Sequence, residues 1–463
     1  MGQNRAAHSV NAANRMDRLP ICSAHRLLIV AIAFAYFFDI SDISTFSFAA
    51  PTLSKIWHLS IPMVALITAA TFGGMCIGAL VNGWIADRIG RKRSLMLATG
   101  FYSLFSLLSA LAWNPVSLGI FRCLTGIGLA SMLIVASTYV SEFFPAVSRG
   151  KFMGWVVTIG LAGTPATSWV ALFVVSLGTW GWRLIFVWGA LGIVALFLLF
   201  RVEESPRWYE TYGHTAQTEE ALKRLEAIAI AEKGALPPAA EPVPQPVVHS
   251  VPYRELFEGK YRSRTIMLMA VWIFQALGYY GYRSWVPLLL VSRGFSVTTA
   301  LTFSSVIALG IPFGALLAAY ISDRVERRWA IAINAVFIAL FAMIFGIVSL
   351  PVLVLVFGFL VEFITAAVNP LLTTYTPELY PTEARASGVG LTYSSSRLAN
   401  VIGPFIVGAL LTGPGSIGVF VYIAISWLLA GLAVGLFGPL TSRRSLESIN
   451  QSEIAQVPVA SAT

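Results

Sequence analysis

Charged residues are scarce in this sequence. Asp, Glu, Lys and Arg together make up 11% of its 463 residues, whereas hydrophobic residues make up 57%. Because soluble globular proteins carry about 25% charged residues, this composition excludes an ordinary soluble domain. The surface of so apolar a chain must face lipid or lie inside a very large core. The formal net charge of +9 would suggest a nucleic-acid partner on a soluble protein, so its meaning depends on where the basic residues lie.

Cysteine and histidine are also rare. The three cysteines, Cys22, Cys76 and Cys123, lie in or near apolar stretches and have no paired spacing. They are expected to be small buried apolar residues, with neither a disulfide nor a metal site. Residues 1–23 are polar and lack the apolar core of a signal peptide. The sequence contains no catalytic motif, cofactor fingerprint or histidine cluster, so we expect no cofactor, no metal and no enzymatic activity.

Long uninterrupted apolar runs recur along the chain. A membrane-spanning helix needs about 20 apolar residues, and the runs lack the short alternating pattern of a transmembrane β-barrel. We therefore expect an all-α integral membrane protein with twelve transmembrane helices. The expected spans lie at about 26–49, 61–86, 94–113, 115–141, 149–177, 182–200, 264–292, 298–322, 328–349, 352–376, 385–413 and 416–438.

One long polar segment, about 201–263, separates the sixth span from the seventh. It contains an amphipathic charged stretch, Glu219–Lys233, which predicts a short interfacial helix, and then a proline-rich linker, Pro237–Pro246. The segment divides the chain into two groups of six spans. The expected organisation is a cytoplasmic tail (1–25), a six-helix bundle (26–200), the cytoplasmic linker (201–263), a second six-helix bundle (264–440) and a cytoplasmic tail (441–463).

The basic residues predict how the chain lies in the membrane, because Lys and Arg concentrate in cytoplasmic loops. With the N-terminus inside, the cytoplasmic loops carry nearly all of them, and the outer loops carry only Lys55, Arg183 and Arg293. Both termini are therefore predicted to be cytoplasmic, in a multi-pass protein of the cell inner membrane. The positive net charge is explained as a topology signal, and we expect no nucleic-acid partner.

Two loop motifs each occur twice. The two copies of each motif are separated by the same number of residues, which we call the repeat offset. Asp87 and Asp323 are separated by the same number of positions as Glu142 and Glu378, since 323 − 87 equals 378 − 142. An offset without insertions indicates two copies of a six-helix unit, parallel because both begin inside. The motif residues are Gly83, Asp87, Arg88, Gly90 and Arg91 after span 2, Glu142 and Arg149 after span 4, Asp323 and Arg324 after span 8, and Glu378 and Arg385 after span 10.

Acids and arginines at these helix ends are candidates for a gate. An acid of one half can pair with an arginine of the other half, which would hold the cytoplasmic side shut in one state and break in the next. The alternative is topology alone, since basic residues collect inside in any case. Topology alone leaves the four acids of the motifs unexplained.

These motifs resemble those of a known family. The pattern G-x-x-x-D-R-x-G-R-K between spans 2 and 3 resembles the major facilitator signature at every defined position. The pair of E-x-x-P-x-x-x-R motifs, with Glu204-Ser-Pro-Arg-Trp208, resembles the branch that holds sugar porters and organic-ion or metabolite–proton symporters. The resemblance extends from Arg26 to about Leu440. It implies a rocker-switch transporter whose substrate site lies between the halves near mid-membrane, with spans 1 and 4 lining the cavity.

Five charged residues lie well inside the expected spans, away from their ends, and each needs a reason because a charge at the bilayer centre costs roughly 2.5–3.5 kcal/mol. Span 1 carries Asp39 and Asp42, span 4 carries Arg122, span 10 carries Glu362, and span 11 carries Arg397. Counted from the outer ends of their helices, Asp42 and Arg122 lie at similar depth, so an ion pair is geometrically possible.

We interpret Asp39 or Asp42 as the proton site. Burial favours a protonated carboxyl group, whereas a nearby arginine favours the carboxylate. Movement of Arg122 toward or away from the acid would then couple protonation to the conformational cycle. The alternative is a static pair that only fixes helix packing.

Candidate substrate residues lie in the second half. Arg397 offers bidentate hydrogen bonds to a substrate carboxylate; alternatively, or in addition, it pairs with Glu362. Arg283, near the outer end of span 7, is expected to reach the membrane surface. Gln275 and the tyrosines of span 7 can hydrogen-bond a polar ligand, although tyrosine is also common at membrane interfaces. The full candidate set is Gln275, Tyr279, Tyr282, Glu362, Arg397 and Asn400.

Different spans indicate different substrate classes. Span 4 resembles sugar porters, whereas spans 7 and 11 resemble symporters of organic acids. Sugar porters typically carry a glutamine pair in span 7 and further amide and tryptophan side chains that are absent here, where Phe274 precedes Gln275. We therefore predict a proton-coupled symporter that imports a small organic anion. The alternatives are a sugar or polyol–proton symporter and a drug or metabolite efflux transporter. The expected partners are a small-molecule substrate, protons and the lipid bilayer, and we expect a monomer.

Overall fold

The computed structural model describes residues 11–130, 132–238, 251–321 and 324–442, and these ranges contain helices and no strand. The chain divides into two compact units, one of Met1–Phe46 with Ala70–Gln245 and the other of Ser47–Ala69 with Pro246–Thr463. These units differ in extent from the predicted bundles 26–200 and 264–440. The connection between the first two spans, residues 47–69, belongs to the second unit. Asp323, most of Pro237–Pro246 and nearly all of the tail 441–463 lie outside the described residues.

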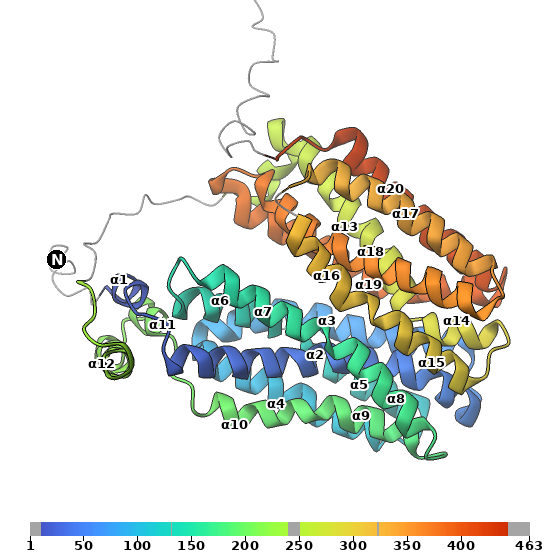
Figure 1. Cartoon of the computed structure of the whole chain (residues 1–463), viewed down its shortest axis with the longest axis horizontal. Coiled ribbons are helices and arrows are strands. Elements are labelled where there is room, and N and C mark those ends of the chain that lie inside the picture. Colours follow the sequence, from blue (N-terminus) through green and yellow to red (C-terminus); the bar gives the residue numbers. More distant parts are fainter. Residues whose placement is uncertain (1–10, 131, 239–250, 322–323, 443–463) are drawn as a thin grey trace, which may run out of the picture. The chain divides into compact units, whose positions relative to one another are not determined.

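The long helices of each unit run lengthwise beside one another (Figure 1). Two helices contribute to both units, α2 (Ser23–Trp57) and α3 (Ile61–Ile89). The other helices of unit 1 are α1 (Ala12–Asp17), α4 (Arg91–Ala110), α5 (Pro115–Leu129), α6 (Met132–Phe143), α7 (Arg149–Leu161), α8 (Gly163–Val175), α9 (Gly181–Ala190), α10 (Ala195–Leu199), α11 (Pro206–Thr211) and α12 (Thr215–Lys233). The α-helices of unit 2 are α13 (Arg262–Arg283), α14 (Val286–Ser292), α15 (Val297–Ala308), α16 (Gly310–Ile321), α17 (Arg327–Ile347), α18 (Pro351–Glu378), α19 (Thr382–Thr412) and α20 (Ser416–Phe437).

These helices follow the twelve expected spans. Several spans consist of two or three consecutive segments; span 6, for example, is α9, a 3₁₀ turn at Leu191–Val194 and α10. In the described part of the chain, ten helices are long and apolar enough to cross a membrane. The remaining two spans correspond to α4 and α13, of 20 and 22 residues. Both carry several polar residues, serines in α4 and tyrosines in α13, and α4 uses one of its serines in the candidate site.

The packing of the two units repeats with the spacing of the loop motifs. A Cβ at Gly78 would collide with the carbonyl oxygen of Ile127, and a Cβ at Gly314 would collide with that of Phe363. The two glycines and the two carbonyls are each related by the repeat offset, since 314 − 78 and 363 − 127 both equal 323 − 87. Small residues let membrane helices approach closely, so the same helix contact forms in the same way in each half. The internal repeat predicted from the loops therefore extends into the helix packing.

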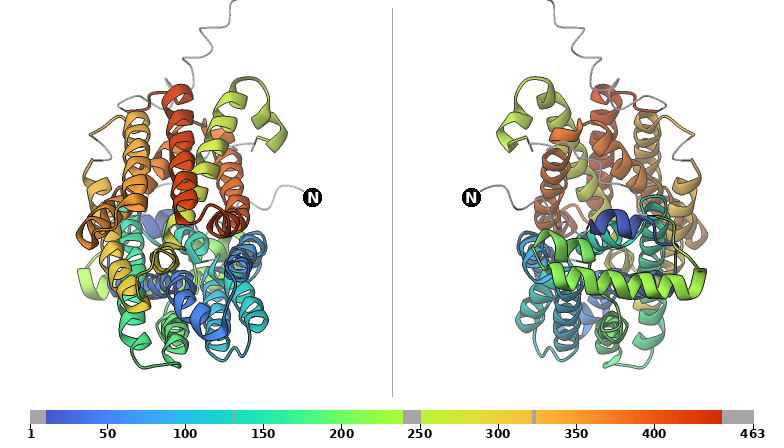
Figure 2. Two further views of the ribbon diagram at one scale, coloured as in Figure 1. Left: turned by 90° about the vertical axis from the view of Figure 1, so that its right-hand side faces the viewer. Right: turned by 90° about the vertical axis from the view of Figure 1, so that its left-hand side faces the viewer.

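Part of the predicted N-terminal tail is helical. Its residues from Ala12 form α1, which packs with α11 and α12 at one end of unit 1, and Figure 2 shows α12 lying across that end with α1 beside it. The two segments share one buried apolar cluster, made of Ala12, Met16, Leu19, Cys22, Leu222, Leu225 and Ala229 among others. The amphipathic stretch Glu219–Lys233 is helical as predicted, and its apolar face covers α1.

Ion pairs reinforce this contact between α1 and α12. The Arg15 guanidinium bonds Glu219 at 2.6 Å and Glu226 at 2.7 Å, and Arg18 bonds Glu226 at 2.6 Å. Burial raises the pKa of Glu226, but the hydrogen bonds from Arg15 and Arg18 outweigh it, so the pKa lies below its ordinary value. The hydrogen bond to Glu226 raises the pKa of Arg15 more than burial lowers it. Arg15 and Arg18, which fall within the predicted tail, thus tie α1 and the residue after it to α12.

Candidate functional site

A fully buried ion pair joins α2 and α5 in unit 1. Arg122 Nη1 lies 2.8 Å from Asp42 Oδ2, and both side chains are 0% exposed. Arg122 Nη2 also donates to the backbone oxygen of residue 42 at 3.1 Å. The ion pair that helix depth predicted is therefore present. Because both charges are removed from water, the two groups depend on each other far more than a surface pair does.

Asp42 is also held by α4 and α9. Its second carboxylate oxygen, Oδ1, accepts a hydrogen bond from the Ser106 hydroxyl on α4. That hydroxyl also lies 3.0 Å from the carbonyl oxygen of Phe186 on α9. Gly189, one turn further along α9, leaves room for the carboxylate, because a Cβ there would collide with Asp42 Oδ1. Four helices therefore converge on one carboxyl group, and each of its oxygens has a different partner.

Asp39 lies in the same buried environment. It is 3% exposed and lies one helical turn before Asp42 on α2. Tyr102 of α4 is fully buried and interacts electrostatically with both aspartates. The Arg122 contacts fall on Asp42, so the geometry distinguishes the two candidate proton sites and favours Asp42.

Arg397 of α19 is partly buried in unit 2. Among the described residues it has neither a hydrogen-bond partner nor an ion-pair partner. The alternative pairing with Glu362 is wrong, because the arginine that interacts electrostatically with Glu362 is Arg283 of α13. Arg283 also donates to the Tyr279 hydroxyl on its own helix. The guanidinium of Arg397 remains available for an anion.

The other candidate substrate residues fall into two groups. Glu362 and Gln275 are each 5% exposed, and Tyr279 lies beside Arg283. Tyr282 is 2% exposed, donates to the carbonyl oxygen of Gly358 at 3.2 Å and packs edge-on against an aromatic ring of α17. Its hydroxyl is therefore used for packing within unit 2, whereas Tyr279 interacts electrostatically with Glu362 of α18.

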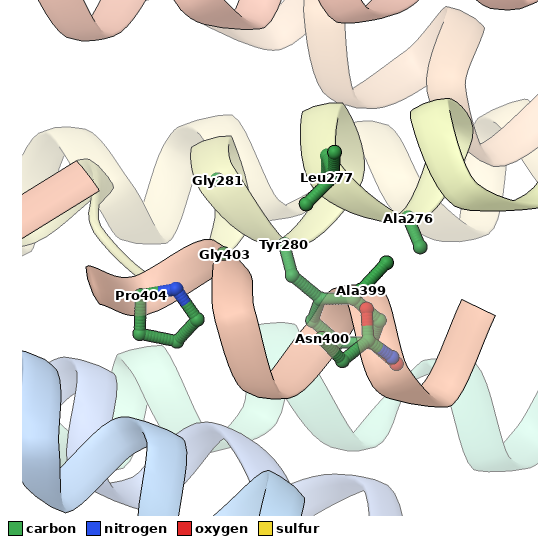
Figure 3. Close-up of a pocket in the computed structure, with 8 residues that line it drawn as sticks. All are labelled: Ala276, Leu277, Tyr280, Gly281, Ala399, Asn400, Gly403 and Pro404. Carbon is green, nitrogen blue, oxygen red and sulfur yellow. The ribbon is translucent and has the colours of Figure 1, made fainter. Parts of the chain in front are cut away.

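A very small pocket lies between α13 and α19. Figure 3 shows Tyr280 extending from α13 toward α19, where Asn400 lies. Asn400 is 4% exposed, and within the described residues its side-chain oxygen accepts no hydrogen bond. The pocket is lined by Ala276, Leu277, Tyr280, Gly281, Ala399, Asn400, Gly403 and Pro404. Of the candidate substrate residues, Asn400 is the one that lines this pocket.

The loop motif after span 2 builds a charge cluster within unit 1. Arg91 Nη2 lies 3.0 Å from Glu142 Oε1, and Arg91 Nη1 lies 2.7 Å from Asp87 Oδ1. Gly90 has a φ of +101°, and a Cβ there would collide with the Glu204 carboxylate. That carboxylate accepts the backbone N–H of Lys92 at 2.9 Å, so it caps α4. Burial raises the pKa of Glu204, and the backbone N–H groups oppose the shift.

The equivalent cluster in unit 2 uses an arginine outside the predicted motif residues. Arg327 Nη1 lies 3.3 Å from Glu378 Oε1. The repeat offset relates Arg327 to Arg91 and Glu378 to Glu142, since 327 − 91 equals 378 − 142. The prediction paired acids and arginines across the halves; the Arg91–Glu142 and Arg327–Glu378 pairs each lie within one unit.

The remaining motif residues serve local roles. Arg88 stacks on Trp84 at 3.9 Å, and Arg324 stacks on Tyr320 at 4.0 Å. Arg385 donates from Nε to the carbonyl oxygen of residue 377 at 3.2 Å. Arg149 is exposed at the start of α7, and a Cβ at Gly83 would meet nothing within 4 Å. Gly83 therefore has no close-packing requirement in this structure.

Comparison with known proteins decides the family. The sequence model of the Major Facilitator Superfamily matches residues 32–351 and, again, 305–461. The chain belongs to the major facilitator superfamily. It is therefore a membrane-spanning transporter of small molecules and not an enzyme.

Several members of the superfamily resemble the whole chain. YyaJ of Bacillus subtilis (strain 168), named as a protein of metabolite transport, is 42% identical over 94% of this chain and 97% of its own length. The niacin transporter NiaP of Acinetobacter baylyi is 30% identical over 94% of this chain and 99% of its own. The gallate transporter of Pseudomonas putida is 31% identical over 90% of this chain and 93% of its own. These relatives match this major facilitator chain over almost its full length.

The solved structures confirm the fold. The xylose transporter XylE of E. coli, in a partially occluded inward-open conformation, superposes with a TM-score of 0.73 and covers 91% of this chain and 100% of its own. The two sequences are 18% identical, so the likeness concerns the fold alone. The predicted all-α major facilitator fold is thereby confirmed.

Proposed function

We propose that this chain is a proton-coupled symporter that imports a small aromatic carboxylate by alternating access, with Asp42 as the proton site. The observation that carries the proposal is the Asp42–Arg122 ion pair, which is 0% exposed on both sides inside a membrane protein. A transporter needs a group that holds a proton in one state and releases it in another. Asp42 is the buried acid in unit 1 whose ionised form depends on a single arginine.

The physical chemistry of the pair supports the coupling. Arginine remains charged under all physiological conditions, so only Asp42 can change its protonation state. While Arg122 contacts Asp42, the carboxylate is favoured; if helix movement separates α2 from α5, burial favours the protonated acid. A small separation of these helices is therefore sufficient to move a proton on or off the protein.

The substrate class follows from Arg397 and from the relatives. Arg397 is partly buried on a membrane helix and has no partner among the described residues, and guanidinium binds carboxylate bidentately. Niacin, gallate and 4-hydroxybenzoate, the compounds in the names of related transporters, are each an aromatic ring with one carboxylate. The buried amide groups of Gln275 and Asn400 supply hydrogen bonds for polar atoms on such a ring.

The direction and location follow from the loops. The excess of Lys and Arg on one side places both termini in the cytoplasm, and the bacterial relatives indicate the cell inner membrane. Coupling to the inward proton gradient would then drive uptake. In this proposal the charge clusters of Arg91 and Arg327 at the cytoplasmic helix ends stabilise one state of the cycle and rearrange in the other.

Two transport modes test the proton site. Uphill uptake requires net proton movement, whereas counterflow exchange of labelled for unlabelled substrate requires none. Asp42→Asn in proteoliposomes is expected to abolish uphill uptake while exchange continues, and Asp17→Asn, the same change outside the membrane helices, is expected to leave both intact. Preserved uphill uptake in Asp42→Asn would mean that Asp42 does not carry the proton.

A thermal-shift screen tests the substrate class. Purified protein is heated with aromatic carboxylates, matched aromatic amides, sugars and amines, because a ligand that binds the folded state raises the melting temperature. Aromatic carboxylates are expected to stabilise the protein and the amides are not, and Arg397→Gln is expected to remove the difference. Stabilisation by sugars alone would overturn the proposed substrate class.

A further inference from the structure

The Ser106 hydroxyl has two possible acceptors for its single hydrogen, one on Asp42 and one on the backbone of α9. This hydroxyl lies within bonding distance of Asp42 Oδ1 and, at 3.0 Å, of the Phe186 carbonyl oxygen. A hydroxyl has one hydrogen and two lone pairs, so it can donate to only one of these oxygens at a time. Ser106 is fully buried, and both acceptors lie inside the same contact of α2, α4 and α9.

Protonation of Asp42 decides which oxygen receives the hydrogen. When Asp42 is ionised, Ser106 donates to Oδ1, because a charged acceptor forms the stronger bond. When Oδ1 takes a proton from the aqueous phase, a new O–H bond forms there and donates to Ser106 Oγ. The Ser106 hydrogen then turns to the Phe186 carbonyl, and no proton leaves the serine.

We infer that Ser106 is a positioning residue that lets Asp42 remain buried in both protonation states and that reports the change to α9. The inference rests on the proposed proton site. The two carboxylate oxygens of Asp42 have different partners: Oδ2 lies 2.8 Å from Arg122 Nη1, and Oδ1 accepts from Ser106. Oδ1 can therefore bind a proton without a direct clash with Arg122. Gly189 keeps this side of the carboxylate open, since any larger residue would occupy the position of Oδ1.

Among the described residues, no acid or base lies within bonding distance of both Asp42 Oδ1 and the Phe186 carbonyl oxygen. The charged and titratable groups that face Asp42 are Arg122 from α5, Tyr102 from α4 and Asp39 from its own helix. From α9 it meets Gly189 and, through Ser106, the Phe186 carbonyl. Ser106 is the group that lies within bonding distance of both Oδ1 and the Phe186 carbonyl of α9, so its removal breaks the connection between protonation and α9.

The experiment measures the pH profile of uphill uptake for Ser106→Ala and Ser106→Cys. Cysteine has nearly the size of serine but is a weak donor, so it separates loss of the hydrogen bond from loss of volume. Ser109→Ala is the matched control, because Ser109 lies nearby on α4 and is equally buried, and its hydroxyl donates to the Phe105 carbonyl of its own helix at 2.8 Å and to no other group among the described residues.

Both Ser106 variants are expected to move the alkaline limb of uptake to higher pH, by about half to one pH unit. The ionised acid loses a charge-assisted bond and the protonated acid only a neutral one, so protonation becomes easier. Ser109→Ala is expected to keep the wild-type profile. Counterflow exchange by each variant shows that the protein is folded, and if Ser106→Ala does not fold, Ser106→Cys decides.

The outcomes separate this inference from the proposed function. Wild-type pH profiles for both Ser106 variants, while Asp42→Asn loses uphill uptake, would refute the role of Ser106 and leave Asp42 as the proton site. An equal shift in Ser109→Ala would also refute it, because any lost hydroxyl in α4 would then have the same effect. Uphill uptake that survives Asp42→Asn would overturn the proposed function itself.

Discussion

Removing one partner of the Asp42–Arg122 pair is predicted to have unequal consequences for stability. Asp42→Asn removes the negative charge and leaves the buried Arg122 guanidinium with neutral acceptors alone, such as the backbone oxygen of residue 42 at 3.1 Å. Arginine cannot lose its charge, and an uncompensated buried charge costs about 3–5 kcal/mol. Arg122→Met leaves the Asp42 carboxyl group instead, which can become neutral by binding a proton.

The two single variants should therefore respond differently to pH. Asp42→Asn is expected to be destabilised by about 3–5 kcal/mol at every pH. Arg122→Met is expected to lose less, and its loss should shrink as the pH falls toward the range in which the acid is neutral in both the folded and the unfolded state. The double variant, with no buried charge, is expected to recover most of the stability while uphill transport remains absent.

Denaturant unfolding in detergent micelles between pH 5 and pH 8 measures these differences. The control is Asp17→Asn, which breaks the more exposed ion pair with Arg207 (3.0 Å) and should cost about 1 kcal/mol or less. Equal losses for Asp42→Asn and Arg122→Met at all pH values would refute the reasoning. Additive losses in the double variant would do so as well, because they would show that the two charges do not depend on each other.

Three further predictions concern other contacts. Gly189→Ala is expected to slow uphill uptake more than exchange, since the added methyl group displaces the Asp42 carboxylate; equal effects on both modes would contradict this. Arg327→Gln and Arg91→Gln, in the two equivalent clusters, are each expected to change the ratio of inward-facing to outward-facing protein, measured by cysteine accessibility; a change in only one of them would contradict the proposed equivalence. Because the pKa of Glu226 is lowered in the folded state, its stabilising contribution is present above the unfolded value and is lost as the pH falls. Glu226→Gln should therefore lower the melting temperature at pH 7 and have little effect near pH 3, and a loss independent of pH would exclude the ion pairs as its cause.

Much of the fold was predictable because a bilayer imposes simple lengths. The run at 61–86 appears as α3, Ile61–Ile89, and the other expected spans agree with helices to within several residues at most ends. The Asp42–Arg122 pair was predictable from depth, since two isolated opposite charges in neighbouring helices have few alternatives in lipid. The repeat was visible because a single offset connects loops and, as the structure adds, helix contacts.

The parts that escaped prediction involve residues without a distinctive signal. Ser106 is one of several serines in α4, and only the structure shows which of them faces Asp42. Arg327 was detectable in principle, because the repeat offset separates it from Arg91, but it falls outside the Asp-Arg dipeptide by which the motif is recognised. The polar composition of residues 1–25 concealed Ala12, Met16 and Leu19, whose burial against α12 depends on a segment far along the chain.

The central claim is that Asp42 carries a proton together with the substrate. Proteoliposomes that hold a pH-sensitive dye, given an outside aromatic carboxylate without an imposed gradient, record substrate entry and internal acidification in one experiment. The account predicts that the wild-type protein acidifies the interior as labelled substrate enters, and that Asp42→Asn exchanges substrate with no pH change. Substrate entry without acidification in the wild type, or acidification that persists in Asp42→Asn, would contradict it.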